Sequence, residues 1–391
     1  MSSKCPNCGV NAMDPFYEVN SVPTNSCILL ETEAEAKAYT RGDMRMEFCN
    51  SCGFIANMAF DQKLTEYSGR YEETQGFSGT FNKFHKQLAE QLIERYDLHQ
   101  KHIVEIGCGK GAFLNMVCEL GNNSGAGFDP GYKGDRTDTT EAANVKFVSD
   151  FYSEKYIEEH GDFIACKMTL EHIPQTYDFI NTVNRSIADK ENAVIFFMVP
   201  ESIRIFRDCA YEDIYYEHVS YFTSGSLARL FEKNDFGTLR LATEYDEQYL
   251  SIEARPKESG AAFIPSPDDL SEVAGYVDTF NKRCSDTINE WKETVGSYLD
   301  NGKKVIMWGS GSKGVAFLKS LGELGDRIEY VVDINPYRQG YYMSGTGQKI
   351  IGPDFLKSYK PDAVIVMNRI YCDEIGQDLA KMGLHPEIKA L

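Results

Sequence analysis

The sequence lacks an excess of positive charge. Its 391 residues include 40 lysines and arginines against 59 aspartates and glutamates, which gives a formal net charge of −19 at pH 7. A strongly negative protein is a poor partner for DNA, RNA or an anionic membrane surface, so we expect none of these. An anionic metabolite stays compatible with this charge, because a local basic pocket is enough to bind one.

Long apolar runs are also missing. No stretch approaches the roughly 18 consecutive apolar residues of a transmembrane helix, and the longest run, 193–199, has the length of a strand. The first residues, Met-Ser-Ser-Lys-Cys, contain no apolar segment typical of a secretory signal. The eleven cysteines are odd in number and irregularly spaced, which is typical of reduced thiols rather than of a disulfide framework. These absences predict a cytoplasmic protein.

The remaining composition is that of a globular protein, with 42% hydrophobic and 25% charged residues. At about 100–200 residues per domain, the length predicts two or three domains. We expect an N-terminal module at 1–65, a central domain at 66–255, and a long helix with a smaller domain at 256–391. The last boundary follows a segment around 256–267 that is rich in Pro, Ser and Gly.

Two short motifs each contain a pair of cysteines. Cys5-Pro-Asn-Cys8-Gly and Cys49-Asn-Ser-Cys52-Gly leave two residues between the thiols and place a glycine after the second one. This spacing lets both sulfurs reach one tetrahedral ion, and the glycine permits the tight turn. Redox dithiols or buried free thiols are the alternatives, but the duplication favours structural zinc. Cys5, Cys8, Cys49 and Cys52 are therefore the predicted ligands of a closed zinc site.

A glycine-rich loop lies at 104–111 and reads Val-Glu-Ile-Gly-Cys-Gly-Lys-Gly. The apolar residues before it predict a buried strand, and 112–120 predict a helix. Gly107, Gly109 and Gly111 allow a bulky ligand to approach the backbone and permit positive φ angles. The loop thus predicts a strand–loop–helix turn whose helix N-terminus favours polar or negative groups.

The glycines alone do not identify the ligand, because 107–112 also fit a relaxed dinucleotide fingerprint. Two acidic residues favour S-adenosylmethionine instead. Glu105 is placed to meet the ammonium group of this methyl donor or to fix the loop, and Asp129 follows the next strand, where it can accept both ribose hydroxyls. Asp150, after the third strand, is the predicted partner of the adenine amino group. Lys167, at the end of the fourth strand, completes the predicted cofactor site.

The central domain alternates predicted strands and helices. A helix is expected at about 81–96, and the expected strands are 103–106, 125–128, 145–148, 163–167 and 193–199. Alternation of this kind predicts an α/β fold with a mainly parallel sheet that helices cover on both faces.

The C-terminal region contains a second glycine loop. Gly309-Ser-Gly311-Ser-Lys-Gly314 is a full G-x-G-x-x-G that follows a predicted strand at 303–308, and a further strand at 330–332 ends at Asp333. On motif grounds this loop is the better match to a dinucleotide site. The alternative is a small Rossmann-like lobe of three or four strands whose loop packs on, or closes over, a ligand held elsewhere. A helix is expected before this lobe, with Ser266 as its N-cap and apolar residues every three or four positions to Leu299.

The segment 215–222, Tyr-Tyr-Glu-His-Val-Ser-Tyr-Phe, is the candidate catalytic element. A histidine beside a carboxylate, here His218, can titrate near neutral pH and act as a base. Tyrosine hydroxyls can stabilise an enolate oxygen. The alternative is a strand-and-turn surface with one structural histidine. His172, which follows the fourth strand, is expected to pack or to lie on the adenine side of the cofactor.

Over essentially its whole length the chain resembles the sugar C-methyltransferases that act on nucleotide-linked 4-keto deoxysugars. The resemblance rests on the paired cysteine motifs, Glu-Ile-Gly-Cys-Gly-Lys-Gly, Tyr-Tyr-Glu-His-Val-Ser-Tyr-Phe, Gly-Ser-Gly-Ser-Lys-Gly and Val-Asp-Ile-Asn-Pro-Tyr-Arg-Gln-Gly. It implies an N-terminal zinc-binding module, a central Rossmann-like class I methyltransferase domain that binds S-adenosylmethionine, and a smaller C-terminal Rossmann-like domain. The implied partner is a nucleotide-linked sugar.

The resemblance also implies roles for individual residues. His218 would be the general base with Glu217 as its neighbour, and Tyr215, Tyr221 and Tyr71 would surround the reacting sugar. The implied reaction removes a proton from the carbon next to the C4 ketone, and the resulting enolate attacks the donor methyl group.

The chain departs from the family pattern at three places. Met168 stands where an asparagine is typical, the connector reads Tyr71-Glu-Glu-Thr-Gln instead of a serine-rich run, and Met367 precedes an asparagine where tryptophan is commoner. These departures leave the acceptor open. The alternatives are an O- or N-methyltransferase of the same fold, an NAD-linked oxidoreductase, or a non-catalytic nucleotide-binding scaffold.

Overall fold

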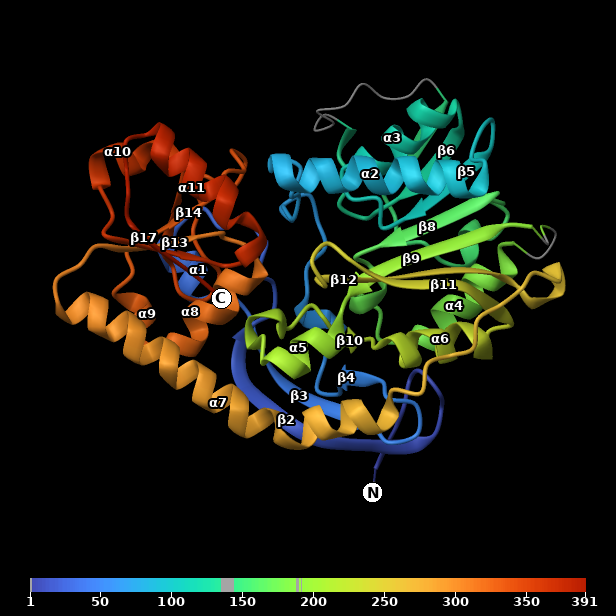
Figure 1. The fold of residues 1–391 in the computed structure, drawn as a ribbon, viewed down its shortest axis with the longest axis horizontal. Helices are drawn as coiled ribbons and strands as arrows, with labels where there is room; N and C mark the ends of the chain where they lie inside the picture. Colours follow the sequence, from blue (N-terminus) through green and yellow to red (C-terminus); the bar gives the residue numbers. More distant parts are fainter. Residues whose placement is uncertain (1, 135–143, 188–189, 191) are drawn as a thin grey trace.

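A computed structural model describes residues 2–134, 144–187, 190 and 192–391, and within these residues three sheets are present (Figure 1). The N-terminal sheet is antiparallel, with the order β1-β2-β3-β4-β10. Its strands are β1 (Ser3–Lys4), β2 (Asn11–Pro23), β3 (Arg41–Cys49), β4 (Ile55–Asn57) and β10 (Ser220–Tyr221). The fifth strand thus comes from the central region of the chain.

The central sheet has seven strands in the order β11-β12-β9-β8-β5-β6-β7. The strands are β5 (His102–Ile106), β6 (Ser124–Phe128), β7 (Val145–Val148), β8 (Phe163–Lys167), β9 (Val194–Pro200), β11 (Phe236–Glu244) and β12 (Tyr249–Pro256). Five neighbouring strands, β9, β8, β5, β6 and β7, are parallel to one another, and β12 and β11 add an antiparallel hairpin at one edge. The predicted parallel sheet is confirmed.

Helices cover both faces of the central sheet. On one face, α2 (Gly79–Tyr96) and α3 (Ala112–Gly121) share a core cluster with strand residues such as Phe163 and Phe196. On the other face, α4 (Thr176–Arg185) and α6 (Ser224–Lys233) pack on side chains such as Ile164 and Ile195. Figure 1 shows the two layers on either side of the sheet.

The C-terminal sheet is parallel throughout, with the order β15-β14-β13-β16-β17. Its elements are β13 (Val305–Trp308), β14 (Tyr330–Val332), β15 (Lys349–Ile351), β16 (Ala363–Val366), β17 (Glu387–Ala390), α8 (Ser312–Leu321), α9 (Glu323–Asp326), α10 (Leu356–Tyr359) and α11 (Cys372–Lys381). The lobe is Rossmann-like as predicted, but it has five strands instead of three or four. The edge strand β17 is exposed and carries no apolar run, so its sequence gives no strand signal.

The long helix α7 (Leu270–Asp300) begins later than predicted. Asp269, not Ser266, occupies the N-cap position. The Ser266 hydroxyl instead donates a hydrogen bond to Glu232, which ties the linker to α6. From there α7 packs against α5 (Ser202–Asp208), β2 and α8, so it runs along the base of the molecule towards the C-terminal lobe (Figure 1). Among the described residues no helix is both long and apolar enough to cross a bilayer.

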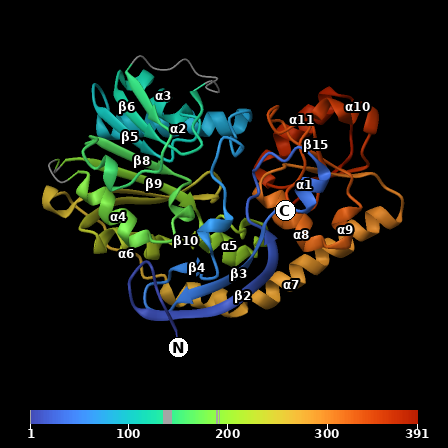
Figure 2. The same cartoon turned by 180° about the vertical axis from the view of Figure 1, so that it is seen from behind.

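Residues 24–40, between the two cysteine motifs, reach across to the C-terminal lobe. This segment contains α1 (Glu33–Lys37), which lies beside β15 in the view from behind (Figure 2). The backbone amide of Tyr342 donates to Leu30 O at 3.0 Å, and that of Gly345 donates to Ala36 O at 2.9 Å. The N-terminal region therefore contacts both other parts of the protein. Short 3-10 turns complete the described structure at Gln62–Leu64, Glu154–Tyr156, Leu170–His172, Tyr211–Asp213, Lys257–Ser259, Pro353–Phe355 and Arg369–Tyr371.

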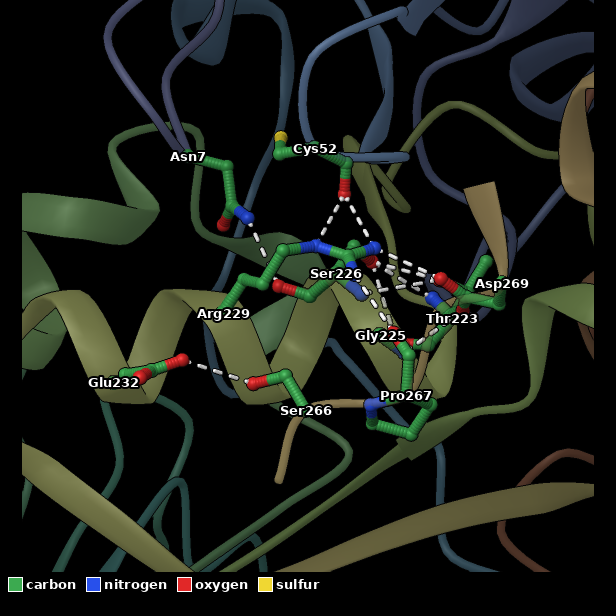
Figure 3. A network of polar contacts seen from close by, with 10 residues as sticks. All are labelled: Asn7, Cys52, Thr223, Gly225, Ser226, Arg229, Glu232, Ser266, Pro267 and Asp269. Carbon is green, nitrogen blue, oxygen red and sulfur yellow. Dashed lines mark hydrogen bonds and ion pairs between the residues drawn. The ribbon is translucent and has the colours of Figure 1, made fainter. Parts of the chain in front are cut away.

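Arg229 on α6 joins three segments that are distant in sequence (Figure 3). Its guanidinium donates to Cys52 O at 3.0 Å, to Pro267 O at 2.8 Å and to the Asp269 carboxylate at 2.8 Å. The same carboxylate accepts a hydrogen bond from the backbone amide of Gly225 at 2.8 Å. The second cysteine motif, α6 and the start of α7 are thereby held together.

We expect Arg229→Met to lower the free energy of unfolding by about 1–3 kcal/mol, because buried carbonyl and carboxylate oxygens would lose their donor. Chemical denaturation followed by circular dichroism measures this. The matched control is Arg185→Met, which breaks an exposed ion pair with Glu154 and should cost less than about 1 kcal/mol. Equal losses in the two variants would contradict the role of Arg229.

Candidate functional site

The four predicted metal ligands converge. The sulfur atoms of Cys5 and Cys52 are 3.8 Å apart, those of Cys8 and Cys49 are 3.7 Å apart, and all four lie within 4.8 Å of one another. A tetrahedral ion with Zn–S bonds of about 2.3 Å requires sulfur–sulfur distances near 3.8 Å. The cluster is therefore compatible with a zinc ion.

The backbone of each cysteine motif forms the turn that the spacing predicts. Gly9 donates its amide to Cys5 O, and Gly53 donates to Cys49 O, each at 2.8 Å. Both glycines have φ above +70°, a region that residues with a Cβ rarely adopt. The eleven cysteines are free thiols, so the pairs are not disulfides.

One cavity of about 570 Å³ lies between the central sheet and the C-terminal lobe. It is open to the carboxyl ends of β5, β6 and β8, where ligands bind in open α/β folds. The glycine loop, the connector around Tyr67–Gln75, the turn after β8, the segment around His218 and the C-terminal glycine loop all contribute lining residues. The two glycine loops thus face one cavity.

The first glycine loop has the backbone that the sequence predicts, although its glycines differ in role. Gly107 and Gly109 line the cavity with φ of +69° and +54°. A Cβ on Gly107 would collide with Thr169. Gly111, with φ of +80°, does not line the cavity; it is the N-cap of α3, and a Cβ there would collide with the ring of Phe147.

Asp129 lies at the cavity and Asp150 does not. The Asp129 carboxylate accepts hydrogen bonds from the backbone amides of Gly109 at 3.0 Å and Gly131 at 2.7 Å. As far as the described residues are concerned, two of its roughly four acceptor sites therefore remain for a ligand. The Asp150 carboxyl is instead held by Lys155 at 2.9 Å and by the Tyr156 hydroxyl at 2.6 Å, outside the cavity lining. Its predicted contact with the adenine amino group stays a prediction.

Glu105 and Lys167 form a buried ion pair behind the loop. Lys167 lines the cavity, with its Nζ 3.9 Å from the centre of the Phe113 ring, whereas Glu105 does not line it. Glu105 was predicted either to meet the ammonium group of the methyl donor or to fix the loop, and this geometry favours the second role.

His218 is almost fully buried and reaches the cavity. Its Nε2 lies 2.6 Å from the Tyr215 hydroxyl, and its Nδ1 has no hydrogen-bond partner among the described residues. Burial holds the pKa of His218 well below its usual range. The imidazole is consequently neutral at neutral pH, which is the form that can accept a proton.

His172 lies against His218 rather than on the adenine side. The two ring centres are 4.9 Å apart. His172 Nδ1 is 2.9 Å from Glu217 O and 3.1 Å from the Tyr67 hydroxyl, and burial lowers the pKa of this histidine to about 4. These contacts agree with the predicted packing role. The contact with His218 was not predicted, and it arises because the 3-10 turn Leu170–His172 brings the ring to the His218 segment.

Glu217 and Tyr221 do not line the cavity. The Glu217 carboxylate accepts hydrogen bonds from the amide and the hydroxyl of Ser26 at 2.6 and 2.8 Å, so it anchors the 24–40 segment. Tyr221 belongs to β10, where its ring packs near Phe206 in the core. Tyr216 and Glu217 lie in a turn, in which the amide of His218 donates to Tyr215 O at 3.1 Å, so Glu217 and His218 meet different surroundings although they adjoin in sequence.

Tyr71 and Tyr215 do line the cavity, and both are accompanied by residues that the sequence does not single out. Tyr67 packs on Tyr71 with ring centres 5.4 Å apart. Of the carboxyl groups in the described residues, that of Glu171 lies nearest to His218, with Oε1 3.9 Å from Nε2. Its position directly after β8, in Leu170-Glu171-His172, is the only sequence signal that could have indicated it.

Charged side chains surround the end of the cavity formed by the C-terminal lobe. Asp213 is contacted by Arg204 and by Lys313, the latter at 2.8 Å. Asp333 accepts hydrogen bonds from Ser310 and from Asn335 and lies 3.7 Å from Arg338. Its acceptor sites are largely used within the lobe, unlike those of Asp129.

Both the central domain and the C-terminal lobe are similar to known proteins. A family model for a methyltransferase domain matches residues 81–241, and a second, for the C-methyltransferase C-terminal domain, matches 267–384. The chain is 25% identical to C-methyltransferase NovU of Streptomyces niveus, over 95% of this chain and 91% of that protein.

Solved structures are similar only in part. The 1,6-didemethyltoxoflavin-N1-methyltransferase of Burkholderia thailandensis, bound to S-adenosylhomocysteine, is 14% identical and has a TM-score of 0.36, with 46% of this chain and 81% of that chain covered. Magnesium protoporphyrin IX methyltransferase of Synechocystis PCC 6803, also bound to S-adenosylhomocysteine, is 10% identical and has a TM-score of 0.36, with 47% of this chain and 89% of that chain covered. Similarities at this level do not bear on the acceptor.

The fold, the glycine loop and the matching family models together define an S-adenosylmethionine-dependent methyltransferase. Within that class, the chain is similar to the C-methyltransferases, since its C-terminal lobe matches the model of their C-terminal domain and 95% of its length aligns with a C-methyltransferase.

Proposed function

We propose that this enzyme methylates the carbon next to the ketone of a nucleotide-linked keto sugar, with His218 as the general base. The observation that carries the proposal is a buried, neutral His218 in the cavity that both glycine loops line. A carbon acceptor needs a base because its proton must be removed before it becomes a nucleophile.

The residues at the first glycine loop fit S-adenosylmethionine. Gly107 and Gly109 leave the backbone open to a ligand, and Asp129 has free acceptor sites for ribose hydroxyls. Lys167 and Glu105 hold the loop from behind. When bound, S-adenosylmethionine supplies an electrophilic methyl group.

His218 would take up the proton of the carbon next to the ketone. The Tyr215 hydroxyl, 2.6 Å from Nε2, orients the ring, and the neighbouring neutral His172 adds no positive charge that would oppose protonation. Tyr71 and Tyr67 close this side of the cavity with aromatic surface and hydroxyl groups, which exclude water from the reacting carbon.

The C-terminal lobe would hold the nucleotide part of the acceptor. Arg204 and Lys313, which both contact Asp213, bring two cationic side chains to this end of the cavity. The N-terminus of α8 has no side-chain cap, and backbone amides at such an end favour phosphate groups. Because Asp333 is largely used within the lobe, the ribose contact expected of a dinucleotide site has less support here.

We also propose that Cys5, Cys8, Cys49 and Cys52 bind a structural zinc ion. All four ligand positions of a tetrahedral site would be filled by sulfur, which leaves none for a reacting molecule.

The acceptor is tested with purified enzyme, S-adenosylmethionine and a panel of nucleotide-linked 4-keto sugars. We expect mass spectrometry to show a product in which one hydrogen of the acceptor is replaced by a methyl group. Carbon NMR should place this methyl group on the carbon next to the ketone. A methyl group on oxygen or nitrogen would overturn the proposed C-methylation, and the same panel without methyl donor is the control.

A further inference from the structure

Glu171 is fixed against the catalytic segment by its backbone. Its carbonyl oxygen accepts a hydrogen bond from the amide of Val219 at 2.9 Å, which joins the turn after β8 to the strand that follows His218. The side chain lines the cavity, and Oε1 lies 3.9 Å from His218 Nε2. The carboxyl group is therefore held beside the base from a different element of the fold.

The carboxyl group of Glu171 is buried without the partners that a carboxylate needs. Only 1% of the residue is exposed, and neither Oε1 nor Oε2 has a hydrogen-bond partner among the described residues. Two other buried acids differ in this respect, since each is paired with a lysine: Glu105 with Lys167 and Asp213 with Lys313. An isolated buried carboxylate is costly, so such a group is stable in its neutral, protonated form.

We propose that Glu171, as a neutral carboxylic acid, donates a hydrogen bond to the carbonyl oxygen of the acceptor while His218 removes the adjacent proton. This role rests on the proposed enolate chemistry. A buried acid that stays protonated can stabilise an enolate oxygen without being consumed.

Protons and electrons balance in this step. His218 takes the proton from carbon and becomes an imidazolium; the electron pair of the broken C–H bond forms the new carbon–carbon double bond, and the carbonyl π pair moves to oxygen. Glu171 keeps its own proton and shares it with that oxygen. When the enolate carbon bonds to the methyl group, the π pair of the carbon–carbon double bond becomes the new bond, and an oxygen lone pair restores the carbonyl group. The carbon–sulfur bond of the methyl donor breaks in the same step, and its electron pair stays on sulfur as S-adenosylhomocysteine leaves. The imidazolium later loses its proton to solvent.

The surroundings of Glu171 agree with a neutral acid. Burial raises its pKa to about 8. The titratable groups that face it are His218 and Tyr215 from the catalytic segment, His172 from its own turn, Tyr67 from the connector, and Cys166 and Tyr249 from β8 and β12. Burial lowers the pKa of both histidines and raises that of the tyrosines and the thiol, so all six are uncharged near neutral pH. Below pH 8 the donor is present, and above pH 8 it is lost.

The test is solvent deuterium exchange at the carbon next to the ketone, followed by NMR without methyl donor. In Glu171→Leu we expect exchange and kcat/KM to fall by about 10²–10³-fold, as for loss of one oxyanion donor. In Glu171→Gln the amide still donates, so both rates should stay within about tenfold of wild type. The Gln variant should also lose the fall in kcat/KM that wild type shows as the pH rises through about 8.

Glu201→Gln is the matched control. Glu201 is equally buried, burial raises its pKa to about 7, and it lies outside the cavity lining, so exchange should be unchanged. Absence of exchange in wild type would overturn the proposed function itself. If wild type shows exchange, two results would overturn the donor role alone. One is exchange in Glu171→Leu that is as fast as in wild type, and the other is exchange in Glu171→Gln that is as slow as in Glu171→Leu. If the Leu variant does not fold, the pH dependence of kcat/KM in Glu171→Gln still tests the proposal, because a fall through about pH 8 that persists in this variant would contradict it.

Discussion

Replacement of His218 by asparagine is expected to lower kcat by about 10²–10⁴-fold, the contribution of a positioned general base. The side chain is buried beside Tyr215 at the cavity, and no other described imidazole takes this position, because His172 is held by Glu217 O and Tyr67. Binding of S-adenosylmethionine should be unchanged, since its residues lie at the glycine loop. Steady-state kinetics and calorimetry with S-adenosylmethionine measure the two effects separately.

The control for this variant is His99→Asn, at an exposed position just after α2, which should have wild-type kinetics. Deuterium exchange at the acceptor carbon adds a readout that does not need methyl transfer. Turnover close to wild type in His218→Asn would remove the base assignment, whereas lost S-adenosylmethionine binding would point to a folding defect.

Replacement of Cys49 by serine is expected to abolish stoichiometric zinc binding and to destabilise the protein more than any other substitution considered. Structural zinc sites contribute about 10–16 kcal/mol of binding free energy to the folded state. The four sulfurs hold the ends of β1–β2 and β3–β4 together, and Cys52 O is also an acceptor of Arg229. Metal analysis and thermal unfolding followed by circular dichroism measure the two losses.

Cys372→Ser is the matched control for the zinc prediction. This thiol is half-buried on α11, far from the cluster in sequence, and its loss should change neither metal content nor the unfolding temperature by more than a few degrees. If Cys49→Ser retained one metal ion per chain, the four-sulfur site would be wrong. Retained stability after metal loss would show that the ion is not structural.

Features encoded by local spacing could be predicted from the sequence. The cysteine pairs, the glycine loop and the individual strands each depend on residues only a few positions apart, and the structure reproduces the expected turns and the parallel sheet. The predicted start of α7 was wrong for a physical reason. Ser266 and Asp269 both suit an N-cap, but the Ser266 hydroxyl is hydrogen-bonded to Glu232 of α6, which is distant in sequence.

The surroundings of the base could not be read from neighbours in sequence. Glu217 adjoins His218 in the chain but turns away to bind Ser26, while Glu171, which comes from another element, is the nearest carboxyl group. Asp150 ends the expected strand but is held by Lys155 at the surface. These outcomes depend on which side of the backbone a side chain leaves and on which segment packs against it, and neither is contained in motif spacing.

The N-terminal sheet is completed by a strand that the ribosome makes much later. β4 pairs with β10, whose residues Ser220–Tyr221 emerge only after most of the central sheet has been synthesised. Segment 24–40 forms its contacts later still, because its backbone partners Tyr342 and Gly345 are synthesised near the end of the chain. The first part of the chain to be made is thus among the last to reach its final contacts. During synthesis the zinc ion proposed for the four cysteines would be the main element that keeps this early segment ordered. On that proposal, cells short of zinc are expected to accumulate aggregated nascent enzyme rather than inactive folded enzyme.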